Sequence, residues 1–190
     1  LPCAAGTHSN ATNLTSATEC TDADAGHYAT TGSTEQTPCS PGTVAPNASM
    51  GSCRKCDAGT YQEVPGETAC DACMLGSYCA AGSAAALPCP AGRWTNRTDV
   101  QSTEGCYACW VGHACSIGTS QPTPCAAGTY TNITGLPSCV KCEPGRFQAS
   151  EGKTACDACE VGAYCQAGAT AAMPCQAGTF GDTTNLGSQS

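Results

Sequence analysis

The sequence predicts an elongated rod of small, tandem, disulfide-rich modules, built from short β-hairpins and loops with little or no helix. Cysteine contributes 19 of the 190 residues, a density typical of disulfide scaffolds. Aromatic residues make up only 5% of the chain, so each module must be held by covalent links rather than by a large hydrophobic core. The third observation is that the cysteine spacing repeats along the chain.

The cysteine spacing has a period of 86 residues. The cysteines at 39, 53, 56, 70, 73, 79 and 89 recur at 125, 139, 142, 156, 159, 165 and 175 without insertion or deletion. We therefore divide the chain into a short unit that lacks one disulfide (1–38), a long unit (39–88), a second short unit (89–124), a second long unit (125–174) and the start of a further unit (175–190). Units stacked in this way touch mainly their sequence neighbours, which predicts the rod.

Two alanines in the first short unit indicate how the cysteines pair. Ala23 and Ala29 stand where the period would place cysteines equivalent to Cys109 and Cys115. A single loss would leave a reactive thiol, so a joint loss indicates that these two positions form one disulfide. This predicts the local pairs Cys73–Cys79, Cys109–Cys115 and Cys159–Cys165.

The other cysteines pair most simply as neighbours that close loops of similar size. The expected pairs are Cys3–Cys20, Cys39–Cys53, Cys56–Cys70, Cys89–Cys106, Cys125–Cys139 and Cys142–Cys156. Cys175 is then unpaired or paired outside the chain, since the period places its partner two positions beyond Ser190. We expect the chain to be a window onto a longer repeat protein; an intermolecular bond from Cys175 is the alternative.

The larger loops open with Cys-x-x-Gly-x-aromatic, as in CDAGTY (56–61) and CAAGTY (125–130). We expect the glycine to take a positive φ in a turn and the ring to fold over the disulfide. The Cys-x5-Cys segments, such as CMLGSYC (73–79), predict tight turns. The links after them end in proline before the next cysteine, which favours an extended backbone.

Five Asn-x-Ser/Thr sequons lie in the larger loops and favour an extracellular or cell-surface protein that carries covalent glycans. Their asparagines are Asn10, Asn13, Asn47, Asn96 and Asn132. We expect all five to be N-glycosylated, with competition between the closely spaced Asn10 and Asn13.

Other classes of function find little support in the residues. Only seven lysines and arginines are present against a net charge of −8, so we expect no nucleic-acid partner, and no apolar run is long enough to span a membrane. The five Cys-x-x-Cys pairs would suit zinc or redox chemistry, but the sequons and the paired loss at 23 and 29 favour disulfides. His8, His27 and His113 are expected to be solvated loop residues. We expect no catalytic residues, metal or cofactor, and no enzyme.

The stretch CDAGTYQEVPGETACDACMLGSYC (56–79) resembles the ephrin-receptor-like cysteine-rich repeats of many large protist and animal extracellular proteins. It is also similar to the first half of a tumour-necrosis-factor-receptor module. The resemblance implies stacked, disulfide-linked modules at a cell surface. The receptor modules have interleaved cross-links in their second half, whereas the paired loss at 23 and 29 favours a local link, so receptor function does not carry over.

These observations favour a glycosylated extracellular structural repeat protein, part of a filament, surface coat or flagellar-hair-like appendage of a unicellular eukaryote. Its partners would be copies of itself or other extracellular structural proteins. The alternative is a ligand- or cell-binding module of a receptor or adhesin ectodomain, and a metal- or redox-active protein is a third hypothesis.

Overall fold

The computed structural model of the chain describes residues 1–176 and 183–188. The chain forms two compact units, one made of Leu1–Leu87 with Arg97–Gly105 and the other of Pro88–Asn96 with Cys106–Ser190. Regular structure in the described residues consists only of two-residue strands and 3₁₀ turns, as the sequence predicts. The rod-like shape expected for the whole chain stays a prediction.

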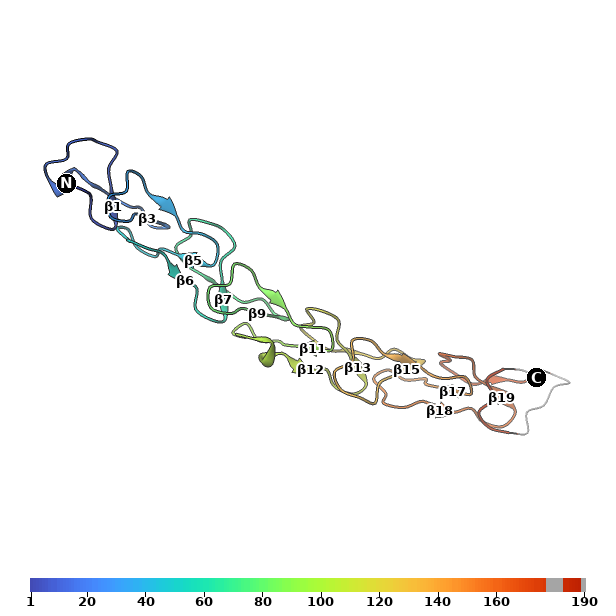
Figure 1. The fold of residues 1–190 in the computed structure, drawn as a ribbon. Coiled ribbons are helices and arrows are strands. Elements are labelled where there is room, and N and C mark those ends of the chain that lie inside the picture. The colour runs from blue at the N-terminus through green and yellow to red at the C-terminus, as the bar shows by residue number, and fades with distance from the viewer. Residues whose placement is uncertain (177–182, 189–190) are drawn as a thin grey trace. The chain divides into compact units, whose positions relative to one another are not determined.

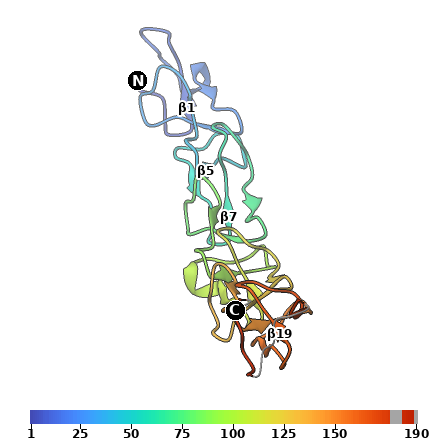
Figure 2. The same cartoon turned by 90° about the vertical axis from the view of Figure 1, so that its right-hand side faces the viewer.

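In the first unit, strands alternate with loops from the N-terminus onward (Figure 1). The elements in this part of the chain are β1 (Thr7–His8), η1 (Ala17–Glu19), β2 (Thr21–Asp22), β3 (His27–Tyr28), β4 (Thr37–Pro38), β5 (Thr43–Val44), β6 (Arg54–Lys55), β7 (Thr60–Tyr61), β8 (Asp71–Ala72), β9 (Ser77–Tyr78), β10 (Leu87–Pro88) and η2 (Thr103–Gly105). Figure 2 shows β1, β5 and β7 in chain order along this unit.

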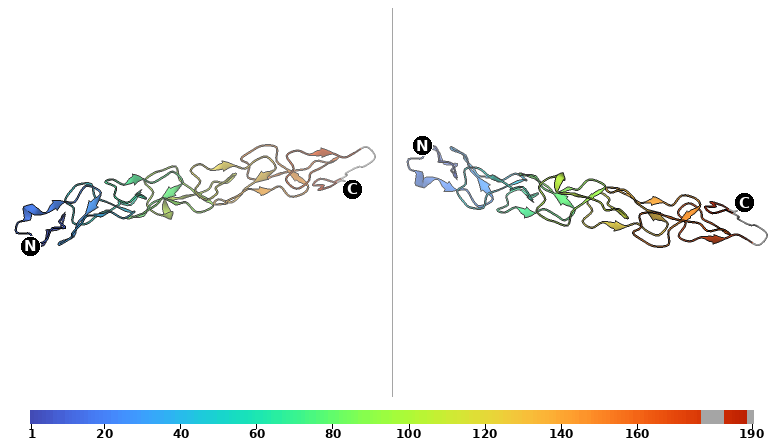
Figure 3. Two further views of the ribbon diagram at one scale, coloured as in Figure 1. Left: turned by 90° about the horizontal axis from the view of Figure 1, so that it is seen from above. Right: turned by 90° about the horizontal axis from the view of Figure 1, so that it is seen from below.

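The second unit repeats the same pattern. Its strands are β11 (Arg93–Trp94), β12 (Tyr107–Ala108), β13 (His113–Ala114), β14 (Thr123–Pro124), β15 (Thr129–Tyr130), β16 (Val140–Lys141), β17 (Arg146–Phe147), β18 (Asp157–Ala158), β19 (Ala163–Tyr164) and β20 (Met173–Pro174). Figure 3 shows the short strands of both units from two opposite sides.

Consecutive strands pair into antiparallel hairpins, and the cysteines stand next to the paired residues. In the hairpin that begins at Cys125, Thr129 pairs with Lys141 and Tyr130 with Val140. The hairpin that begins at Cys109 has the same form, with His113 opposite Pro124 and Ala114 opposite Thr123. The prolines before cysteines thus lie in extended strands, as expected. The Cys-x5-Cys segments begin hairpins of the same kind as the larger loops.

Each hairpin starts with a Cys-x-x-Gly turn, or Ala-x-x-Gly at Ala23. The turn glycine takes a positive φ, for example +82° at Gly92 and +84° at Gly26, which confirms the expected conformation. Only glycine adopts this region without strain. The starts in the described chain are Cys3, Ala23, Cys39, Cys56, Cys73, Cys89, Cys109, Cys125, Cys142 and Cys159. The finer repeat is therefore one hairpin of 16–20 residues, and five hairpins make up the 86-residue period.

Backbone hydrogen bonds join each hairpin to the next. Between the hairpins that begin at Cys109 and Cys125, the Gly112 N–H donates to the Thr131 carbonyl at 2.9 Å, and the Cys125 N–H donates to the Gly112 carbonyl at 2.8 Å. The Gly135 N–H, in the loop of the second hairpin, donates to the Cys109 carbonyl at 2.8 Å. These three bonds form a backbone ladder, in which the Gly112 N–H also donates to the Thr131 hydroxyl at 2.8 Å. Equivalent backbone bonds recur at hairpins with different side chains, such as the Gly26 N–H to the Ala45 carbonyl.

Each hairpin in the two examples below also contacts the hairpin that lies two further along the chain. A Cβ added to Gly92 would lie 2.0 Å from the carbonyl oxygen of Gly135, in a loop two hairpins further on. In the first unit, a Cβ at Gly26 would lie 1.9 Å from the carbonyl oxygen of Gly66, also two hairpins on. In both cases the turn of one hairpin is covered by the loop of the second hairpin after it.

Disulfides form most of the buried interior, in agreement with the composition. Most fully buried side chains are cysteines, and Ala23 and Ala29 are buried where the equivalent hairpins have Cys109 and Cys115. Other hairpins fill the buried position six residues after the start with a polar group, such as Thr131 or Gln148. The Gln148 side chain donates to the Ala155 carbonyl and accepts from the Ser150 N–H, which satisfies its amide.

Candidate functional site

Among the described residues, nine disulfides are present, and they join the pairs that the repeat predicts. They are Cys3–Cys20, Cys39–Cys53, Cys56–Cys70, Cys73–Cys79, Cys89–Cys106, Cys109–Cys115, Cys125–Cys139, Cys142–Cys156 and Cys159–Cys165. Cys175 is half-buried and free.

Peptide mapping of the native protein without reduction should recover these nine pairs. The local pair Cys109–Cys115 is expected because both sulfurs belong to one hairpin start, six residues apart. A peptide that links Cys106 to Cys115, or Cys109 to Cys125, would contradict the local pattern and restore the interleaved arrangement.

The residues that could serve metal or redox chemistry are engaged elsewhere. The two cysteines of each Cys-x-x-Cys pair belong to different disulfides; Cys53 pairs with Cys39, and Cys56 with Cys70. The three histidines are half-buried and lie in first strands of hairpins rather than in solvated loops. Within the described residues, no three His, Cys, Asp or Glu side chains gather as metal ligands would.

The sequon loops are the clearest candidate functional surface. All five asparagines are exposed, and they follow the first strand of the hairpins that begin at Cys3, Cys39, Cys89 and Cys125. The sequon hairpins that begin at Cys3 and Cys39 are separated by one hairpin without a sequon, and so are those that begin at Cys89 and Cys125. Attachment of glycans at these asparagines stays a prediction.

Local hydrogen bonds order two of these loops. In the loop with Asn10 and Asn13, the Glu19 carboxylate accepts from the Thr15 hydroxyl at 2.8 Å and from the Thr15 and Ser16 N–H groups, and these bonds lower the pKa of Glu19. Beside Asn96, the Arg97 guanidinium donates twice to the Asp99 carboxylate, at 2.8 and 2.6 Å, and lowers the pKa of Asp99.

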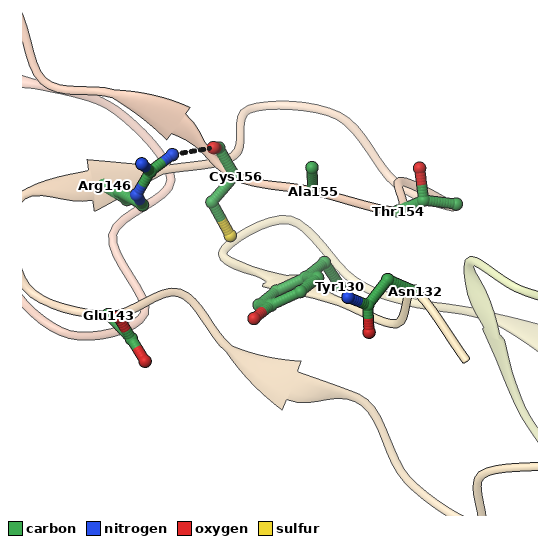
Figure 4. A pocket seen from close by; sticks show the side chains of 7 residues that line it. All are labelled: Tyr130, Asn132, Glu143, Arg146, Thr154, Ala155 and Cys156. Carbon is green, nitrogen blue, oxygen red and sulfur yellow. Dashed lines mark hydrogen bonds between the residues drawn. The ribbon is translucent and has the colours of Figure 1, made fainter.

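A hollow of about 230 Å³ lies directly beside the sequon asparagine Asn132. Its lining comes from the end of β15, the turn and first strand of the next hairpin, and the segment before β18: Tyr130, Asn132, Glu143, Arg146, Thr154, Ala155 and Cys156. Figure 4 shows the Tyr130 ring and the Asn132 amide next to one another on one wall. On the opposite wall Arg146 donates to the Cys156 carbonyl at 3.0 Å, which fixes its guanidinium.

An equivalent hollow of about 220 Å³ lies one period earlier. Val44 and Pro46 stand where the later hollow has Tyr130 and Asn132, and Thr60 replaces Arg146. The sequon asparagine of this hairpin, Asn47, is one residue further along and does not line the hollow. The two hollows therefore share a backbone and differ in the groups that could hold a ligand.

The second unit holds an aromatic cluster that the sequence did not predict. The Trp94 ring lies 5.0 Å from the Trp110 ring and 6.0 Å from the Tyr107 ring, and Trp110 lies 5.7 Å from the His113 ring. Trp110 and Tyr107 are about half exposed, at 52% and 48%. The signal available in the sequence was the tryptophan in the Cys-x-x-Gly turn at 109–112, where no other turn has an aromatic residue.

The expectation that each aromatic ring covers the disulfide of its own loop is wrong for Trp94. This ring is buried against the Cys109–Cys115 disulfide of the next hairpin rather than against Cys89–Cys106. The reason is the ladder, which brings the start of the next hairpin onto the first strand of the preceding one.

Hairpins that are closed by disulfides and are linked by a backbone ladder define the class of tandem, disulfide-rich repeat proteins. Within this chain, residues 128–175 match the family model described as "Tyrosine-protein kinase ephrin type A/B receptor-like". This match confirms the resemblance to ephrin-receptor-like cysteine-rich repeats. The stretch one period earlier, 42–89, has the same cysteine spacing. A search of curated proteins found no match to the chain.

The family consists of non-catalytic extracellular modules, and together with the disulfides it indicates an extracellular localisation. In the part of the chain that the structure describes, no helix has the length and apolar character needed to cross a membrane.

Proposed function

We propose that the protein is a glycosylated structural repeat protein that forms part of an extracellular filament, surface coat or flagellar-hair-like appendage of a unicellular eukaryote. Its partners in this role are its attached glycans, further copies of itself and other extracellular structural proteins.

The observation that carries the proposal is the backbone ladder between hairpins. Within each compact unit, turn glycines such as Gly26 and Gly112 donate to the next hairpin and accept from its first residue, so a further hairpin can add the same backbone bonds. A structure that gains length by repetition suits a fibrous or layered role. Covalent closure of the hairpins suits exposure outside the cell, where disulfides persist.

The positions of the sequons support a decorated surface. The asparagines are exposed, whereas the backbone groups of the ladder are used between hairpins. Glycans at these positions add bulk and solubility without competing for the ladder.

A ligand- or cell-binding module of a receptor or adhesin is the second candidate. The exposed aromatic cluster favours it, because Tyr107 and Trp110 present large, half-exposed rings with Val111 beside them. Aromatic residues are enriched in binding surfaces.

Electron microscopy of native material, combined with intact-mass measurement before and after enzymatic removal of N-glycans, separates the two candidates. The structural role predicts ordered assemblies that contain this protein and a mass loss at the sequons. Double substitution of Tyr107 and Trp110 by serine should leave these assemblies intact. Isolation as dispersed monomers that lose binding to cells on this double substitution would instead establish the binding module.

A further inference from the structure

We propose that the hollow beside Tyr130 is a built-in sugar site, in which the first sugar of the Asn132 glycan packs its ring against the face of Tyr130. The inference rests on the proposed glycosylation of Asn132. It goes further by assigning the attached sugar a fixed position on the protein.

Covalent attachment selects the ligand. Glycosylation joins Nδ2 of Asn132 to C1 of the sugar; the amide gives up one proton, and the lipid diphosphate of the sugar donor leaves. Asn132 itself lines the hollow and lies beside the Tyr130 ring, so the first sugar is held at the mouth of the hollow (Figure 4). Tethering at this distance gives the sugar a high effective concentration there.

The lining suits a sugar ring. One wall is the ring of the half-exposed Tyr130, and the negative π-face of such a ring attracts the C–H groups of a pyranose. The lining also includes the Glu143 carboxylate, which can accept hydrogen bonds from a sugar, and the Thr154 hydroxyl, which can donate or accept them. A few polar groups around an aromatic wall are typical of small-ligand sites.

The other sequon hairpins lack this combination. Trp94, the aromatic residue before Asn96, is only 9% exposed because it is buried against the next disulfide. Val44 is 5% exposed, and Asn47 lies outside the equivalent hollow. At the first hairpin, the residue in this place is the half-buried His8. The structure therefore assigns the stacked sugar to Asn132.

The test uses the secreted glycoprotein, trimmed by an endoglycosidase to one N-acetylglucosamine at each occupied sequon. Carbon–proton NMR spectra then report each sugar. We expect the ring protons of the Asn132 sugar to move upfield under the Tyr130 ring current, while those of the Asn47 sugar keep the values of a free glycopeptide. The matched variant is Tyr130→Val, which copies Val44; it should abolish the shift at Asn132 only. Tyr130→Phe should retain it.

The outcomes distinguish the sugar site from the glycosylation on which it rests. Asn132 found unoccupied by mass spectrometry would overturn both the glycan proposal and the sugar site. Asn132 occupied, but with sugar shifts equal to those at Asn47 and unchanged by Tyr130→Val, would overturn the sugar site alone. Peptide mapping of the disulfides in each variant verifies that the hairpins have formed.

Discussion

Gly92→Ala should destabilise the second unit, and by more than the same substitution at Gly162. Both are turn glycines of their hairpins and have nearly equal positive φ, +82° and +83°. Alanine in this conformation costs about 1–2 kcal/mol. At Gly92 the new Cβ would also lie 2.0 Å from the Gly135 carbonyl oxygen, so the backbone two hairpins away must shift, which adds about 1–3 kcal/mol.

Gly162→Ala, made in the same 190-residue chain, is the matched control, because no described atom of that chain lies within 4 Å of the added Cβ. Hydrogen exchange measures the local effect at the Cys109 N–H, which donates to the Gly92 carbonyl, and at the Cys175 N–H, which donates to the Gly162 carbonyl. Relative to the unsubstituted chain, exchange at Cys109 in Gly92→Ala should accelerate by about tenfold or more beyond the acceleration at Cys175 in Gly162→Ala, because of the extra strain. Equal acceleration at the two sites would show that the loop containing Gly135 does not cover the turn at Gly92.

The double substitution Ala23→Cys with Ala29→Cys should form a tenth disulfide and stabilise the first unit by about 2 kcal/mol. The backbone at these alanines matches that of natural Cys-x5-Cys hairpins. The Ala23 N–H donates to the carbonyl of the preceding turn glycine at 2.9 Å, and the Ala29 N–H donates to the Met50 carbonyl at 3.0 Å. Both side chains are fully buried, so the new sulfurs are shielded.

Thiol titration and the thermal unfolding midpoint test this expectation. The double variant should show no reactive thiol beyond that of Cys175, and its midpoint should rise by several degrees. Ala23→Cys alone is the control; it should add one thiol without raising the midpoint. Two reactive thiols in addition to Cys175, in a folded double variant, would disprove the equivalence of positions 23 and 29 with Cys109 and Cys115.

The framework of the fold could be predicted because cysteines and glycines impose discrete constraints. The joint loss at Ala23 and Ala29 was enough to propose local pairs, and the turn glycines required a positive φ. The contact between Gly92 and Gly135 could not be predicted from these constraints. It depends on the displacement between successive hairpins that the backbone hydrogen bonds set. Backbone bonds do not require particular side chains, so the sequence holds no pattern that reveals this displacement.

The candidate site was predictable only in part. The sequons identified Asn132, but the hollow beside it depends on three separate segments, from Tyr130 to Cys156, that meet only in the folded chain. The burial of Trp94 was likewise decided by the next hairpin rather than by its own loop. The repeat of one hairpin per 16–20 residues was visible in the sequence, because Ala-x-x-Gly at 23–26 matches the Cys-x-x-Gly turns. The spacing of cysteines alone did not reveal it, because this hairpin begins with alanine.

The distribution of disulfides determines how the chain would respond to a pulling force. Every large hairpin loop is closed by a disulfide near its two ends, such as Cys125–Cys139, while the links after Cys79, Cys115 and Cys165 lie outside any such closure. Under tension in an oxidising medium, the ladder bonds can open and these links can extend, but the length inside each large loop stays locked. The protein thus combines a limited reserve of elastic length with a fixed maximum extension, and reduction of its disulfides would release the rest.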